Sequence, residues 1–344
     1  MKIESINIRN YKSLVDIKIN KPNPFTVFAG PNASGKSNIF EALEFLSFVE
    51  NRIEPNRIFS VFGSFNDLIN KNIFQKNSNS KIGFQIFMVD TVENLFEFAI
   101  QFDAKGRVPL NWENSISLNN DQMTEKIAKV DRQLLNDHFI NSIQMIFINN
   151  YFINRQKYQD NQKLDFYASN LEKVLKRLLK VEIVREEIIE WLQLFIPEFE
   201  NIEVSTNELS GDDSLLIYEK YTKKPFPRNL LSDGTFNILA LLTAVYQSDE
   251  PQFLCIEEPE NGLNPQVIKE LVGFFREACE EKGHYIWLTT HSQTLVSELQ
   301  PKEIIIVDKK NGETKIKQFE NLNLHGLKMD EAWLSNVLDG GLPW

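Results

Sequence analysis

The fold is decided by the stretch Ala29-Gly30-Pro31-Asn32-Ala33-Ser34-Gly35-Lys36-Ser37. An apolar run at 25–29 leads into it, and residues 38–43 leave it with helical spacing. The two glycines allow backbone angles that a Cβ would penalise, so successive N–H groups can curl around an anion at the positive end of the following helix. The pattern therefore predicts a phosphate-binding loop rather than an ordinary glycine turn. Lys36 is expected to reach the β- and γ-phosphates of a nucleotide, and the Ser37 hydroxyl to coordinate Mg²⁺.

The composition sets the class of protein. The 344 residues carry 48 acidic and 37 basic side chains, a net charge of −11, which argues against wholesale coating of nucleic acid. Cys255 and Cys279 have no spacing typical of a zinc site or a disulfide framework. No signal peptide and no run of about 18 apolar residues is present, so we expect a cytoplasmic protein with no membrane partner.

The N-terminal part is predicted to be rich in antiparallel strands. Residues 2–8 and 14–19 alternate like the two strands of a hairpin, and the phenylalanine-rich segments 82–87 and 95–102 alternate in the same way around a turn at 92–94. Tyr11 lies 25 residues before Lys36. It is expected either to fold back and stack on a nucleotide base or to pack at a strand end.

The middle of the chain changes to a helical period. Residues 121–200 are predicted to form a helical insertion, and residues 202–221 return to strand-like alternation. One helix of the insertion has a basic face that is either solvated or in contact with nucleic acid, formed by Lys173, Lys176, Arg177 and Lys180.

The second half of the predicted site follows the insertion. Ser232 and Gly234 open an apolar helix, a start that leaves N–H groups available to an anion. A buried strand at 253–256 ends in Glu257 and Glu258. Adjacent carboxylates at that place suggest that Glu257 holds hydrated Mg²⁺ and that Glu258 deprotonates the attacking water, unless both are exposed turn acids. A further strand at 285–290 ends in His291, where it can contact the γ-phosphate.

Five motifs in this order resemble the ABC-type ATPase clade that includes SMC, RecF and OLD-family proteins, and more narrowly its short, stand-alone AAA family members. The matching segments are 10–13, 30–37, 231–235, 256–263 and 290–292. Ala33 stands where glycine is more usual, and Glu257 where many relatives have Asp.

The resemblance implies a head that works as a homodimer or higher homo-oligomer. ATP bound to Lys36 and Ser37 of one subunit would be capped by residues 232–234 of the other. Glu257 would be the Walker B acid, Glu258 the general base and His291 the switch histidine, with residues 261–263 as the D-loop. The expected ATP-contacting residues are Tyr11, Lys12, Gly30, Asn32, Ala33, Ser34, Gly35, Lys36, Ser37, Asn38, Ser232 and Gly234.

The predicted fold class is α/β, a P-loop NTPase of the ABC-ATPase head type. It would have a mixed, largely parallel core sheet, an antiparallel β subdomain and a helical insertion lobe. We expect an N-terminal ATPase lobe at 1–105, the insertion with its β return at 106–228, a C-terminal ATPase lobe at 229–308 and a tail at 309–344.

The leading functional prediction is an ATP-driven switch that gates a separately encoded effector, such as a nuclease, in antiphage defence or DNA repair. An ATP-dependent DNA clamp and the nucleotide-binding subunit of a membrane transporter are the alternatives. The C-terminal aromatic residues are expected either to dock another chain or to fold over the head.

Overall fold

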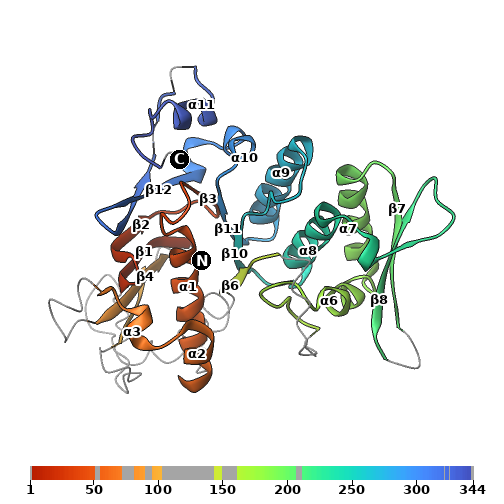
Figure 1. The fold of residues 1–344 in the computed structure, drawn as a ribbon, viewed down its shortest axis with the longest axis horizontal. Helices are drawn as coiled ribbons and strands as arrows, with labels where there is room; N and C mark the ends of the chain where they lie inside the picture. The colour runs from red at the N-terminus through yellow and green to blue at the C-terminus, as the bar shows by residue number, and fades with distance from the viewer. Residues whose placement is uncertain are drawn as a thin grey trace. The chain divides into compact units, whose positions relative to one another are not determined.

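The computed structural model describes residues 2–50, 55–71, 81–89, 95–102, 143–148, 161–206, 211–320, 322–324 and 326–341 (Figure 1). The chain divides into two compact units, one made of Met1–Gln144 with Thr289–Trp344 and the other of Met145–Leu288. Each unit is described by itself below. The division into four segments along the sequence stays a prediction.

The first unit contains the predicted antiparallel sheet. Its strand order is β2-β1-β4-β5, formed by β1 (Lys2–Tyr11), β2 (Leu14–Asn20), β4 (Ile82–Val89) and β5 (Leu95–Phe102). Alternate residues of β4 are buried, as period-2 patterning requires. Both strand pairs are thus confirmed, while the turn predicted at 92–94 lies outside the described residues.

The first unit also holds the strand that leads into the predicted phosphate loop. All five residues of β3 (Phe25–Ala29) are buried, and β3 pairs in parallel with β12 (Ile304–Lys310). On its other side β12 pairs antiparallel with β13 (Glu313–Gln318). The combination of parallel and antiparallel pairs confirms the mixed sheet. The helix α1 (Lys36–Glu50) begins directly after the loop.

Shorter helices complete the first unit. They are α2 (Pro55–Phe62), α3 (Phe65–Leu68), α10 (Gln293–Ser297), η3 (Pro301–Glu303) and α11 (Met329–Leu334).

The second unit carries one further predicted core strand, most of another, and two long helices. β10 (Phe253–Glu257) and β11 (Tyr285–Thr290) are neighbours in one sheet, and their apolar residues are buried on both faces. The helices are α8 (Asp233–Tyr246) and α9 (Pro265–Glu281). The bounds of these two strands and two helices agree closely with those expected from the sequence.

The insertion contains the predicted helices and one strand that the helical prediction did not include. The helices α6 (Leu171–Leu178) and α7 (Glu182–Phe195) precede the paired strands β7 (Phe199–Thr206) and β8 (Asp213–Glu219), which Figure 1 labels. With β9 (Phe226–Pro227) these strands form a three-stranded sheet, and η2 (Arg228–Leu230) follows it. Residues Ile143–Ile146 form the short strand β6, so a helix there was wrong. Two β-branched residues in four explain the difference.

The described part of the C-terminal tail folds onto its own unit. Trp333 and Leu338 are fully buried, and the Trp333 indole N–H donates to the Gly341 carbonyl at 2.6 Å. Gly341 runs so close to β12 that a Cβ there would lie 2.3 Å from Ile306. For Trp333 the structure therefore shows the intramolecular interpretation, while Trp344 lies outside the described residues. Among the described residues, no helix combines the length and the apolar character needed to cross a bilayer.

His284 is a buried histidine that couples stability to pH. Its Nδ1 accepts from the Gln252 N–H at 3.2 Å and its Nε2 lies 3.2 Å from the Val245 carbonyl, so the neutral ring satisfies both nitrogens. Burial, the main cause, lowers the pKa of His284 from 6.5 to about 4.

This pKa predicts acid sensitivity. Below pH 6.5 the unfolded chain binds a proton at His284 that the folded chain does not bind until about pH 4, so stability is full above pH 6.5 and falls between these values. We expect the wild type to lose about 3 kcal/mol more than a His284→Gln variant over this range. Urea unfolding at a series of pH values measures the difference. If the free energy of unfolding of both proteins fell equally with pH, the prediction would be contradicted.

Candidate nucleotide site

The loop between β3 and α1 has the backbone of a phosphate cradle. Ala33 has φ +60° and Gly35 has φ +105°, so both lie in the left-handed region. Gly35 tolerates this conformation, while at Ala33 the Cβ makes it costly. A strained loop residue that the surrounding structure maintains is typical of binding sites.

Residues of the strands β12 and β13 pack closely against both glycines of the loop. A Cβ at Gly30 would lie 2.1 Å from the Val307 carbonyl oxygen on β12. A Cβ at Gly35 would lie 2.1 Å from the Thr314 hydroxyl on β13 and 2.8 Å from the Ser13 hydroxyl. The glycines are therefore required by packing as well as by backbone angle.

The polar groups of the loop suit a polyphosphate. The Lys36 ammonium donates to the carbonyls of Gly30 (2.8 Å) and Pro31 (3.0 Å), and Lys36 is only 8% exposed. The Ser34 hydroxyl is buried and makes no hydrogen bond within the described part of the chain. A buried cation beside a buried hydroxyl, on a curl of N–H groups, fits a triphosphate.

The other loop residues are more accessible. Asn32, Ala33 and Ser37 are exposed, so their groups can reach a ligand from the surface. The Asn38 amide instead donates to the Ser13 hydroxyl at 2.7 Å. Asn38 thus supports the loop in this structure, and its predicted contact with ATP stays a prediction.

Tyr11 packs in the core. Its side chain is fully buried, its ring lies 5.8 Å from the Phe45 ring centroid, and its hydroxyl donates to Glu41 at 3.1 Å. Burial, with the Glu41 charge, raises the pKa of Tyr11 well above 10.0. Of the two alternatives for Tyr11, the structure shows the side chain packed at the end of β1, with no exposed face of the ring. The Lys12 ammonium is paired with both Glu41 oxygens, and its predicted contact with ATP stays a prediction.

The predicted carboxylates follow β10 in the second unit. Glu258 has φ +45°, a left-handed conformation that is rare for a long side chain. The Asn261 amide donates to the Glu258 carboxylate at 3.2 Å, and the Asn261 N–H to the Glu258 carbonyl at 3.2 Å. Such a maintained outlier at the end of a core strand indicates a functional position. Glu257 is the last residue of β10 and is partly exposed.

The start of α8 lies against the loop that follows β10. Ser232 is the N-cap: its exposed hydroxyl accepts from the Thr235 N–H at 3.1 Å. A Cβ at Gly234 would lie 2.5 Å from the Gly262 carbonyl oxygen. The predicted signature and D-loop are therefore packed together within one unit.

Asn237 connects α8 to the loop that follows β10 by hydrogen bonds. Its amide is buried and donates to the carbonyls of Pro259 and Asn261, both at 2.8 Å. These carbonyls flank the turn that follows Glu258. Asn237 was not expected from the sequence, where it is one polar residue in an apolar helix.

An Asn237→Ala substitution is expected to lower kcat about tenfold and leave ATP affinity unchanged, because it removes two donors from the Glu258 loop but none from the phosphate loop. Steady-state turnover and equilibrium nucleotide binding measure the two effects. Asn170→Ala is the matched control, since Asn170 is also buried and its amide also holds a carbonyl, that of Lys163 at 2.9 Å. Equal kcat values for both variants would argue against the proposed role.

His291 follows β11 and is exposed. The turn after it is held by the Ser292 N–H, which donates to the Thr290 hydroxyl at 2.9 Å, and the Ser292 side chain caps α10. His291 and the phosphate loop belong to the same unit, whereas Glu257, Glu258, Ser232 and Gly234 belong to the other.

Thr314 is a second residue at the site that the sequence did not reveal. Its hydroxyl donates to the Ser34 carbonyl at 2.9 Å and lies 2.6 Å from the Ser13 hydroxyl. Its place on β13 brings it to a loop 280 residues earlier in the chain. A lone threonine in an edge strand gives no sequence signal for such a contact.

Known proteins match the chain over most of its length. Residues 25–297 match the family described as "AAA domain, putative AbiEii toxin, Type IV TA system". An "ATP/GTP phosphatase" of Helicobacter pylori is 22% identical over 339 residues, with 86% of each chain covered.

Two solved structures have the same fold. An SmcHead bound to the C-winged helix domain of ScpA has a TM-score of 0.57 at 16% identity, covering 96% of this chain and 99% of that chain. The SMC head domain from Thermotoga maritima has a TM-score of 0.52 at 16% identity, covering 93% and 100%. At this identity the likeness shows the fold alone, and it confirms the predicted fold class.

Proposed function

Because the chain belongs to the AAA-domain family that it matches over residues 25–297 and is a P-loop ATPase of the ABC type, we propose that it works as an ATP-dependent dimer whose nucleotide state controls a partner effector. The role of each residue below is part of this proposal.

Nucleotide binding is assigned to the first unit. Lys36, held by two loop carbonyls, and the buried Ser34 hydroxyl would bind phosphate oxygens together with the N–H groups around Gly35. The exposed Ser37 hydroxyl of this unit would be one oxygen ligand of Mg²⁺, and the resemblance assigns the Glu257 carboxylate of the other unit as a second. When bound, Mg²⁺ neutralises charge that develops on the phosphates.

Glu258 would accept the proton of the attacking water. Its left-handed backbone and its contacts with Asn261 support this role, since they fix the carboxylate at the end of β10. His291 would contact the γ-phosphate from the end of β11. Its exposure leaves the ring accessible to a ligand.

The observation that supports dimerisation is the exposed start of α8. Ser232 and Asp233 are exposed, and Gly234 packs directly against Gly262. The signature at 232–234 and the D-loop at 261–263 therefore form one continuous surface. A helix start of this kind attracts an anion. In the proposal it caps the γ-phosphate held by Lys36 of a second copy.

The effector is proposed from the resemblance. A separately encoded nuclease in antiphage defence or DNA repair would be released or activated when the dimer forms or opens. The DNA-clamp alternative is weakened by the contacts of its basic helix face. Lys176 is paired with Asp213 at 2.7 Å, and Arg177 donates to backbone carbonyls of Asn161, Gln162 and Gln247.

The experiment is a mass measurement with and without nucleotide. Light scattering on the purified chain with ADP should give the 40.0 kDa monomer, and a slowly hydrolysed ATP analogue with Mg²⁺ should give twice that mass. A monomer in both conditions would reject the dimer. A Lys36→Ala variant serves as control and should stay monomeric with either nucleotide.

A further inference from the structure

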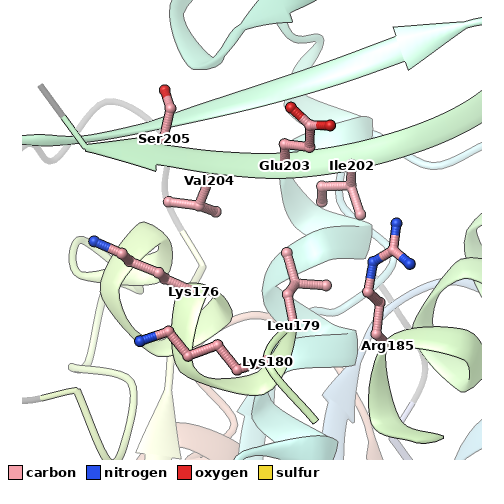
Figure 2. A pocket seen from close by; sticks show the side chains of 8 residues that line it. All are labelled: Lys176, Leu179, Lys180, Arg185, Ile202, Glu203, Val204 and Ser205. Atoms are coloured by element: carbon pink, nitrogen blue, oxygen red, sulfur yellow. The ribbon is translucent and has the colours of Figure 1, made fainter. Parts of the chain in front are cut away.

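A cavity of about 310 Å³ opens between the end of α6, the start of α7 and the strand β7, all within the second unit (Figure 2). Its lining combines aliphatic side chains with three cationic ones. The ATPase site uses none of these residues. The cavity is therefore a candidate for a separate binding function.

The floor of the cavity is aliphatic. Figure 2 shows Ile202 and Val204 pointing from β7 toward the helices, where Leu179 faces them. Glu203 and Ser205 point to the opposite face of the strand, as alternation requires, and the Tyr218 hydroxyl donates to Glu203 at 3.0 Å. The one carboxylate among the lining residues thus does not face the floor.

Cationic groups flank this floor. Lys176 and Lys180 lie on one side and Arg185 on the other in Figure 2. Lys176 is already paired with Asp213, and Arg185 donates to the Asn201 side chain at 3.0 Å, which leaves most of the guanidinium N–H groups for other acceptors. Lys180 is exposed, and its ammonium has no acidic partner among the residues that the structure describes.

Apolar surface continues beyond the cavity. Val181 and Ile183, which lie between Lys180 and Arg185 in the chain, are 51% and 68% exposed. Exposed aliphatic residues between cations are typical of a surface that another protein covers.

We propose that this cavity docks a partner segment whose apolar side chain is flanked by acidic residues. An aliphatic or aromatic side chain would lie on the half-buried Leu179 and Val204, above the buried Ile202, and carboxylates on both sides of it would pair with Lys180 and Arg185. Since the whole chain has a net charge of −11, such a segment is repelled elsewhere and attracted here, which gives the site its selectivity.

The lining favours an acidic peptide over a nucleic acid. Proteins that bind single strands stack bases on aromatic side chains and follow the backbone with a continuous row of cations. The lining residues of this cavity include no aromatic side chain, and the cations are separated by the aliphatic floor.

The proposal deepens the proposed function, on which it rests for the role of the docked partner. Peptide binding itself requires neither ATP nor a dimer. A test without nucleotide therefore separates failure of this site from failure of the ATP-driven switch.

The probe is a fluorescent peptide of sequence Glu-Asp-Glu-Leu-Phe-Leu-Glu-Asp-Glu, titrated with the full chain and followed by fluorescence anisotropy. Saturable binding is expected, weaker at high salt because exposed charges are screened. A Lys180→Glu, Arg185→Glu double variant should bind at least about tenfold more weakly, and so should wild type with a peptide whose Leu-Phe-Leu centre is Ser-Gly-Ser.

Controls keep this test decisive. Lys18→Glu with Lys302→Glu reverses two exposed charges of the other unit and should leave peptide binding unchanged. Lys180→Glu alone, which breaks no ion pair among the described residues, should already weaken binding. ATP turnover of these variants should match wild type, which shows that they fold.

Three outcomes would overturn the proposal. The first is peptide binding that survives the double reversal. The second is equal affinity for the serine-centred peptide. The third is that a twenty-nucleotide oligothymidylate binds more tightly than the peptide and that the same charge reversal abolishes this binding. The surface would then be a nucleic-acid site.

Discussion

A Glu258→Gln protein should hydrolyse ATP about 10²- to 10⁴-fold more slowly than wild type, because the amide cannot accept the proton of the attacking water. Its ATP affinity should not fall, since the groups of the phosphate loop are untouched. ATP-dependent dimers should persist longer because the bound ATP is hydrolysed more slowly. Phosphate release under saturating ATP measures the first effect and light scattering the last.

The matched control is Glu250→Gln, the same chemical change at an exposed glutamate before β10. It should turn over ATP like wild type. Unchanged hydrolysis in the Glu258 variant would remove this residue from the role of general base. The left-handed backbone of Glu258 would then need another explanation.

A Gly35→Ala substitution should abolish nucleotide binding and destabilise the protein by about 3 kcal/mol. Two costs add: alanine is strained at φ +105°, and its Cβ would lie 2.1 Å from the Thr314 hydroxyl. The loop must move to relieve them, and its N–H groups then leave the phosphates. Binding of a fluorescent ATP analogue and the urea midpoint measure both losses.

Gly273→Ala is the control for this substitution. Gly273 lies within α9, and a Cβ there would meet nothing within 4 Å, so alanine should stabilise the helix by about 0.5–1 kcal/mol. Adding Thr314→Ala to Gly35→Ala removes the closest contact but leaves the Ser13 hydroxyl at 2.8 Å and the strained angle, so stability should recover only in part. Normal ATP binding by Gly35→Ala would contradict the cradle geometry.

The phosphate loop, the core strands and the longer helices could be predicted from the sequence because each depends on residues close together in the chain. Glycines, Lys36 and Ser37 stand at fixed spacing between a buried run and a helix. The runs at β10 and β11 are apolar throughout and end in polar residues. Local pattern was sufficient for these elements.

The supports of the site could not be predicted, since they depend on contacts between distant segments. Thr314 reaches the loop only because β13 pairs with β12, and Asn237 reaches the Glu258 loop only through packing of α8. For Tyr11 and Arg177 the sequence left a ligand contact as one of two alternatives. In the structure the Tyr11 hydroxyl donates to Glu41, and Arg177 donates to three backbone carbonyls. Position in the sequence does not reveal which polar group the fold has already paired.

The central claim is that each nucleotide is bound by one copy and capped by another. Its most direct test is ATP turnover in a mixture of two variants that are each inactive, Lys36→Ala and Ser232→Arg. Each mixed dimer has one intact site of its two, so the equal mixture should regain activity, up to about half of the wild-type level. Activity that stays at the level of the separate variants would contradict shared sites, as would a Ser232→Arg protein that is fully active on its own.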